Sequence, residues 1–236
     1  MKIFILFILP VLIAFNCSAE EELMLTVQNK SGDPYPYILN YESMAPKYVI
    51  ILFPGGSGVM NPHMQDGKLV YAFKGNFVIK ARKYIVDKDF ATVATNSTQS
   101  SERIQAIIDD IYKRFPQTKI YLMGTSNGTF DTMALAGYLS DKIAGVIHTS
   151  SLSRISTLDA SKYKNRQLIV HHKDDICKVT PLASAESANK KYGTDLIVME
   201  GGISVGDLCE PLAHHGFNGI VKETADKIKE WIRQGK

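Results

Sequence analysis

The 236-residue sequence predicts an α/β fold, with a mostly parallel central sheet of about eight strands and helices on both of its faces. Short apolar or β-branched runs alternate with segments of helical periodicity, and turn residues separate them. No internal repeat or low-complexity tract interrupts this pattern. Strands that alternate with helices pair in parallel through crossover connections, so the pattern favours a parallel sheet.

The predicted strands are short runs bounded by turn residues. In chain order they cover residues 23–27, 37–39, 48–53, 91–94, 119–123, 145–148, 167–171 and 195–199. We expect the two earliest strands to form an antiparallel edge. Apolar residues at helical spacing predict two helices, around Ile104, Ile107, Ile108 and Ile111, and around Val221, Ala225, Ile228 and Ile232. A third helix is expected over residues 129–139.

Composition and charge limit the function classes. With 45% hydrophobic and 22% charged residues, the chain is an ordinary globular protein rather than a disordered, collagen-like or polytopic membrane protein. Its 27 basic and 24 acidic residues give a formal charge of +3 and are mixed along the chain, so no basic stripe predicts a nucleic-acid partner. The length fits one domain, which we assign to residues 20–236.

Residues 1–19 have the pattern of a secretory signal peptide. A basic residue precedes an apolar run over residues 3–15, and a small pair ending at Ala19 precedes an acidic stretch. We expect cleavage after Ala19 and export to the periplasm or the medium, with no stable membrane insertion afterwards. Two alternatives stay open: a retained anchor, for which the run is short, and a lipoprotein acylated at Cys17.

Export affects the interpretation of the cysteines. If Cys17 leaves with the signal peptide, Cys177 and Cys209 remain as an even pair in an oxidising compartment, where a disulfide is the expected state. Two buried free thiols are the alternative.

A strand, a glycine-rich turn and a helix follow one another around Ser126. The predicted strand runs directly into Gly-Thr-Ser-Asn-Gly at residues 124–128, which is the G-x-S-x-G pattern of a nucleophile elbow. The glycines allow a tight turn with Ser126 at its apex, and the N-terminus of the next helix points toward the serine. A plain turn with an incidental serine is the alternative.

Candidates for an acid and a base follow the serine in the chain. A late strand ends just before Asp174 and Asp175, and the loop after the last strand ends in His214 and His215. A serine hydroxyl needs a base to accept its proton and an acid to orient that base. Catalytic triads occur in several chain orders, and Ser followed by Asp and then His is one of them. The order of the candidates here therefore fits a triad.

Together, these motifs resemble the α/β-hydrolase superfamily over nearly all of the mature chain, and more narrowly small exported bacterial hydrolases of unassigned substrate. The resemblance rests on PGGSG, GNFVIKAR, GTSNGT, HHKDDICKVTP and HHGF, at residues 54–58, 75–82, 124–129, 171–181 and 214–217. It implies an α/β-hydrolase fold and a serine esterase with Ser126 as nucleophile. It also implies Asp175 as acid rather than Asp174, and His215 as base rather than His214. His172 stands where the family's H-G-x-x-D pattern has glycine. The alignment could therefore be displaced by one residue, so Asp174 stays an alternative to Asp175.

The oxyanion of a tetrahedral intermediate needs two N–H donors. One is expected from Asn127, directly after the nucleophile. By resemblance to the H-G-x-x-G and HGGG loops of esterases, the other is expected from Gly56, with Ser57 as second choice. Pro54 replaces the histidine that usually begins such a loop.

The loop lengths predict an open site that takes small or surface-accessible acyl groups. Residues 150–166 must supply a crossover connection and its helix, which leaves no room for a lid domain. Ester, thioester and amide substrates remain chemically possible. The longer loop over residues 57–74 contains His63, Tyr71 and Phe73, which either wall the pocket or pack as ordinary loop residues. We expect a monomer that acts on a small acyl substrate without a cofactor.

Two other function classes remain alternatives. The first is a metal site, because the sequence clusters residues that suit zinc: His171, His172, Asp174, Asp175, Cys177, Cys209, His214 and His215. Their spacing matches no regular zinc motif, so no metal ligand is assigned, and His171 and His214 are expected to pack around the site. The second alternative is a catalytically inactive hydrolase fold that serves as a binding protein.

Overall fold

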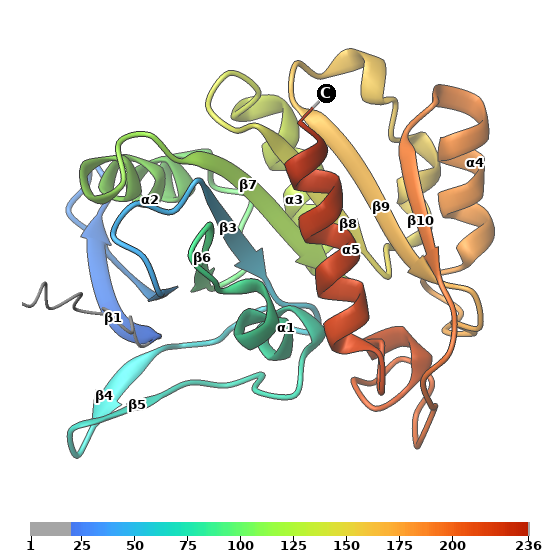
Figure 1. Ribbon diagram of the computed structural model, residues 1–236, viewed down its shortest axis with the longest axis horizontal. Coiled ribbons are helices and arrows are strands. Elements are labelled where there is room, and N and C mark those ends of the chain that lie inside the picture. Colours follow the sequence, from blue (N-terminus) through green and yellow to red (C-terminus); the bar gives the residue numbers. More distant parts are fainter. Residues whose placement is uncertain (1–19, 236) are drawn as a thin grey trace, which may run out of the picture.

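An eight-stranded sheet forms the centre of the protein in a computed structural model that describes residues 20–235 (Figure 1). Its strands are β1 (Glu21–Gln28), β2 (Pro34–Tyr41), β3 (Tyr48–Phe53), β6 (Phe90–Thr95), β7 (Lys119–Thr125), β8 (Gly145–Thr149), β9 (Arg166–His172) and β10 (Asp195–Met199). They lie in the order β1-β2-β6-β3-β7-β8-β9-β10. The pairings from β6 to β10 are parallel, and β2 pairs antiparallel with both β1 and β6. The carboxyl ends of the parallel strands therefore meet at one edge of the sheet.

Helices cover both faces of the sheet because its central strands are apolar on both sides. In β3, Val49 and Ile51 pack into one core cluster while Ile50 and Leu52 pack into another. The helices α1 (Phe77–Ile85) and α5 (Val221–Gln234) cover the face in front in Figure 1. The opposite face is covered by α2 (Ser101–Arg114), α3 (Gly128–Tyr138) and α4 (Leu182–Tyr192).

The structure confirms three predictions for the described residues: a sheet of eight strands, an antiparallel edge, and no inserted lid between β8 and β9. The two apolar stripes correspond to α2 and α5, and the helix expected over residues 129–139 is α3. The helices α1 and α4 were not predicted. In α4 only Ala185 and Ala188 are buried, so its apolar stripe is too weak to be recognised.

The prediction of a crossover helix within residues 150–166 is wrong. This connection contains only two short 3₁₀ helices, η1 (Ser153–Thr157) and η2 (Ala160–Lys162). Side chains there compete with the backbone for hydrogen bonds: the Asp159 carboxylate accepts bonds from both the N–H and the hydroxyl of Ser161, at 3.1 and 2.6 Å. A serine- and threonine-rich segment of this kind favours turns over a continuous helix.

A hairpin of β4 (His63–Gln65) and β5 (Lys68–Val70) projects from the loop that follows β3 (Figure 1). Its turn contains Asp66 and Gly67, both at positive φ, as a two-residue type I′ turn requires. The hairpin therefore lengthens the loop at the carboxyl end of β3.

The predicted signal peptide, with Cys17 and the cleavage position at Ala19, lies outside the described residues. Within residues 20–235, no helix has the length and apolar character needed to cross a bilayer.

Candidate active site

Ser126 lies at the apex of a sharp turn between β7 and α3. Its backbone has φ +51°, in the left-handed region, which costs a non-glycine residue roughly 1–3 kcal/mol. The flanking glycines allow this turn to pack tightly, because a Cβ on Gly128 would collide with the carbonyl oxygen of Phe53, and one on Gly124 with that of Gly128. The turn is held by its main chain: the N–H of Ser126 donates to Thr149 O at 3.1 Å, and the N–H of Thr129 donates to Ser126 O at 2.9 Å.

The glycine-rich loop after β3 packs directly against this turn. A Cβ on Gly55 would lie 2.9 Å from Ser126 Cβ, and the side chain of Asn127 donates to Gly56 O at 2.9 Å. Gly56 has φ +61°, which a glycine adopts without strain. In residues 20–235, the backbone N–H groups of Gly56, Ser57 and Asn127 have no hydrogen-bond partner. All three expected oxyanion donors are therefore unpaired, one in the turn around Ser126 and two in the loop that packs against this turn.

The three residues singled out in the loop over residues 57–74 behave differently from one another. The ring of Phe73 lies against Gly56, within 3.0 Å of a Cβ built there. Tyr71 accepts a hydrogen bond from Arg82 at 2.6 Å, and the exposed His63 contacts Asn61 O at 2.9 Å. Of the three, Phe73 thus contacts the candidate oxyanion loop, Tyr71 binds the loop to Arg82 of α1, and His63 contacts its own loop.

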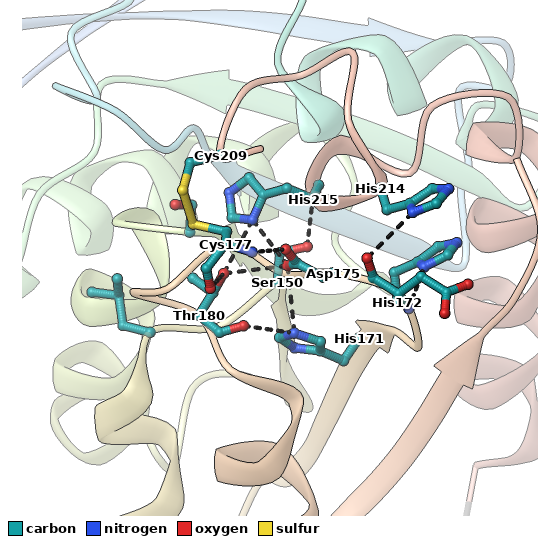
Figure 2. Close-up of polar contacts among 12 residues, drawn as sticks. Ser150, His171, His172, Asp175, Cys177, Thr180, Cys209, His214 and His215 are labelled. Carbon is teal, nitrogen blue, oxygen red and sulfur yellow. Dashed lines mark hydrogen bonds and ion pairs between the residues drawn. A yellow bond between two sulfur atoms is a disulfide. The ribbon is translucent and has the colours of Figure 1, made fainter. Parts of the chain in front are cut away.

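Asp175 and His215 form a buried pair at the carboxyl edge of the sheet (Figure 2). The Nδ1 atom of His215 lies 3.0 Å from Asp175 Oδ2, and the two side chains are 7% and 0% exposed. Asp175 follows β9, whereas His215 lies in the 3₁₀ helix η3 (His214–Gly216) ahead of α5. Residues 40 positions apart in the chain are thus brought into contact.

The other two candidates, Asp174 and His214, lie outside this pair. The Nδ1 atom of His214 contacts the main-chain oxygen of Asp174 at 3.2 Å, and its ring stacks on His172 with 4.3 Å between ring centroids. His172 in turn accepts a bond from the Asp174 N–H at 3.0 Å and donates to Gly201 O at 2.7 Å. Asp174 thus bonds to the two histidines through its main-chain N–H and oxygen. Asp175 is the aspartate whose carboxylate contacts the side chain of His215.

Three further residues make polar contacts with this pair: His171, which was expected to pack around the site, and Thr180 and Ser150, which sequence reasoning missed. The Thr180 hydroxyl lies 3.2 Å from both Asp175 Oδ2 and His215 Nδ1. His171 Nε2 lies 3.5 Å from Asp175 Oδ2, and the Ser150 hydroxyl donates to the main-chain oxygen of His215 at 2.7 Å. Thr180 and His171 stand in the motif at residues 171–181, whereas no local pattern marks Ser150.

Ser150 joins the two halves of the site. The N–H of Ser126 binds the oxygen of Thr149, and the hydroxyl of the next residue, Ser150, binds His215. Ser150 has φ +42°, and Phe217, close to His215, has φ +53°. Such strained residues cluster at functional sites when the surrounding contacts over-determine them.

No hydrogen bond joins the Ser126 hydroxyl to His215 in the described part of the chain. In enzymes, hydrogen bonds between a nucleophile and its base are often long before substrate binds.

A disulfide between Cys177 and Cys209 connects the loop that bears Asp175 to the loop that bears His215. The expected bond is therefore present, with 4.9 Å between the Cα atoms. Cys177 is fully buried, and its N–H donates to Asp175 Oδ1 at 3.0 Å. The bond thus acts directly on the segment that holds the carboxylate.

The carboxylate of Asp175 is kept ionised. Burial by itself raises the pKa of this group, but hydrogen bonds from His171 and His215 outweigh it, and the pKa lies well below its usual range. By contrast, burial lowers the pKa of His172, although the Gly201 carbonyl partly opposes the shift. A charged carboxylate beside His215 stabilises a proton on Nδ1 and therefore leaves Nε2 available as a base.

Two groups of metal-ligand types occur at this edge, and neither fits zinc. One contains Asp175, Cys177 and His215, but its sulfur is already in the disulfide. The other contains His172, Asp174 and His214, with ligand atoms within 4.8 Å of one another. Its two imidazole planes are nearly parallel, at 4°, so their in-plane lone pairs do not converge on a tetrahedral ion.

A scan against protein-family models and a search of curated proteins both yield no match for this sequence. Many solved structures share the fold. XC6422 from Xanthomonas campestris, described as an α/β serine hydrolase without a lid, aligns with a TM-score of 0.60 at 13% identity over 88% of this chain and 95% of its own. Est1E from Butyrivibrio proteoclasticus aligns with a TM-score of 0.63 at 16% identity over 90% and 98%. A dienelactone hydrolase from Anabaena variabilis aligns with a TM-score of 0.65 at 13% identity over 91% and 98%.

Proposed function

Because the chain has the α/β-hydrolase fold, we propose that it is a serine hydrolase that cleaves a carboxylic ester or a related acyl bond through an acyl-enzyme intermediate. The observation that carries this proposal is the 3.0 Å contact of His215 with the buried carboxylate of Asp175, at the same sheet edge as the strained Ser126. A buried ionised carboxylate is costly unless it is paired, so such a pair beside a strained serine favours catalysis over packing.

In this mechanism Ser126 Oγ attacks the acyl carbon while His215 Nε2 accepts the hydroxyl proton. Asp175 holds the proton on Nδ1 and stabilises the imidazolium that forms. The leaving alcohol departs with the proton from Nε2. Water, deprotonated by the same nitrogen, then attacks the acyl group on Ser126, releases the acid and restores the serine.

The unpaired N–H groups of Asn127 and Gly56, with Ser57 as second choice, stabilise the oxyanion. The side-chain bond from Asn127 to Gly56 O fixes the two donors relative to each other. Donors that are already oriented require no rearrangement when charge develops on the substrate oxygen.

A fluorophosphonate probe tests the proposal directly. We expect stoichiometric labelling of the wild-type protein at Ser126 and none of Ser126→Ala. Ser187→Ala, which alters an exposed serine on α4, should label like the wild type. Equal labelling of Ser126→Ala, or an unlabelled wild type, would contradict the proposal, and stoichiometric zinc in an unlabelled protein would favour a metal-binding function instead.

The absence of an inserted lid supports a preference for small or surface-accessible acyl groups. A series of nitrophenyl esters from acetyl to dodecanoyl, extended to thioesters and aminoacyl amides, measures this preference. We expect kcat/KM to be highest for short chains. A steady rise into long chains, with activation at a lipid interface, would contradict the open-site proposal.

We further propose that the protein works outside the cytoplasm. Disulfides form and persist in oxidising compartments, and a disulfide next to Asp175 is consistent with export by the predicted signal peptide.

A further inference from the structure

Thr180 forms a closed hydrogen-bond ring with Asp175 and His215. Its Oγ1 lies 3.2 Å from Asp175 Oδ2 and 3.2 Å from His215 Nδ1, and those two atoms are 3.0 Å apart (Figure 2). Thr180 is fully buried, so water does not compete for its hydroxyl. Within residues 20–235 its hydroxyl has one other contact, to Cys177 O, which is longer at 3.5 Å.

The protons of this ring have one consistent arrangement. The ionised carboxylate only accepts hydrogen bonds, so His215 carries a proton on Nδ1 and donates it toward Asp175. The Thr180 hydroxyl then donates its hydrogen to Asp175 Oδ2 and offers a lone pair to the same Nδ1–H. The hydroxyl thereby bridges the acid and the base.

The chain around Thr180 fixes the direction of this hydroxyl. Its N–H donates to Cys177 O at 3.1 Å, and its carbonyl accepts from His171 Nε2 at 2.9 Å. Helix α4 begins two residues later with Pro181 at its N-cap and receives no side-chain cap bond, so helix capping does not account for the Thr180 hydroxyl.

We propose that Thr180 is a positioning residue that aligns the imidazole of His215 through its hydroxyl and fixes the proton on Nδ1. This inference rests on the proposed function, because alignment of His215 matters only if His215 serves as the base. A misplacement of about 1 Å in such a group can lower a rate roughly 100-fold.

The test compares Thr180→Val, which keeps the shape and removes the hydroxyl, with Thr180→Ser, which keeps the hydroxyl. We expect Thr180→Val to lower kcat on a short activated ester about 10- to 100-fold with little change in KM, and Thr180→Ser to stay within about 3-fold of the wild type. Thr194→Val is the matched control, since it removes another buried hydroxyl that bonds a main-chain oxygen, Leu158 O at 2.8 Å. If Thr180→Val does not fold, Thr180→Ala, which also removes the hydroxyl, takes its place in the comparison with Thr180→Ser.

Proton NMR gives a second readout that needs no catalysis. The low-field Nδ1–H resonance of His215, assigned by its loss in His215→Ala, should persist in Thr180→Ser and shift or disappear through exchange in Thr180→Val. An unchanged kcat and resonance in Thr180→Val, or equal losses in the serine and valine variants, would overturn the inference. If the wild type fails to react with a fluorophosphonate, the proposed function fails, and the NMR comparison still decides the role of Thr180.

Discussion

The elbow around Ser126 and the pair of Asp175 and His215 are built in different ways. The elbow is five consecutive residues that end β7 and begin α3, and it is held by main-chain hydrogen bonds and by glycines that allow close packing. Asp175 and His215 are 40 residues apart and are held by the side chains of Ser150 and Thr180 and by a disulfide. The elbow therefore depends on local backbone geometry, whereas the acid–base pair depends on tertiary contacts that single substitutions can remove.

The largest effect is expected at the acid. Asp175→Asn should lower kcat by ~10³-fold or more, because it removes the charge that fixes and stabilises the His215 proton. Asp174→Asn should stay within several-fold of the wild type, because among the described residues the Asp174 side chain makes no hydrogen bond to His215 and its main-chain oxygen contacts His214 instead. Steady-state kinetics on a short activated ester compare the two, and a larger loss in Asp174→Asn would mean that the assignment is displaced by one residue.

Reduction of the disulfide should weaken the acid–base half selectively. Cys177 and Cys209 are 32 residues apart, and closing a loop of this length stabilises a protein by roughly 3 to 4 kcal/mol in the chain-entropy model. We therefore expect a lower Tm, and a fall in kcat that exceeds the rise in KM. The double variant Cys177→Ser/Cys209→Ser separates loss of the bond from effects of the reductant.

Thiol titration of the unfolded, unreduced protein, without residues 1–19, gives the direct check. No free thiol and a monomeric mass are expected. Two free thiols per chain would rule the bond out.

The packing around the buried His148 should weaken as the pH falls. His148 on β8 contacts Thr132 of α3 and Gln167 of β9, both at 3.0 Å. Burial lowers its pKa to about 4, although the bond to Gln167 opposes the shift. The unfolded chain takes up a proton near its ordinary pKa of about 6.5 while the folded protein does not, so stability falls from that pH down to about pH 4.

The shift from 6.5 to about 4 corresponds to about 3 kcal/mol from this group. Urea unfolding between pH 7 and pH 4 measures the loss, with His148→Gln as the matched variant that cannot titrate. If both proteins lose stability in parallel across this range, His148 is not the group responsible.

The smallest effect tests the strain in the elbow itself. At φ +51° an alanine keeps the steric penalty of a Cβ and a glycine does not, so Ser126→Gly should be more stable than Ser126→Ala by about 1 kcal/mol. Urea unfolding of the two inactive variants measures the difference. Equal stabilities would show that this turn stores no strain.

Much of the fold follows from local pattern. The buried strands, the stripes of α2 and α5 and the turn at residues 124–128 are visible because period and turn chemistry act over neighbouring residues. The helix wrongly expected after β8 shows the limit, since serine, threonine and aspartate side chains there bind the nearby backbone instead. In α4 the opposite occurs: the helix forms, but its apolar stripe is too weak to predict it from the sequence.

The sequence by itself predicted the eight-stranded architecture and the sharp turn around Ser126, because periodicity and a contiguous motif indicate them. It also predicted a bond between Cys177 and Cys209 if Cys17 is removed with the signal peptide, because an even pair of cysteines then remains. The resemblance favoured Asp175 over Asp174 as the acid, with a doubt of one residue. Only the tertiary structure decided that Asp175 is the aspartate that contacts His215, and that Thr180 and Ser150 join the expected His171 around the pair. The physical reason is that His215 meets residues 35 to 65 positions away where the loops beyond neighbouring strands converge, and no local pattern encodes which side chains then face each other.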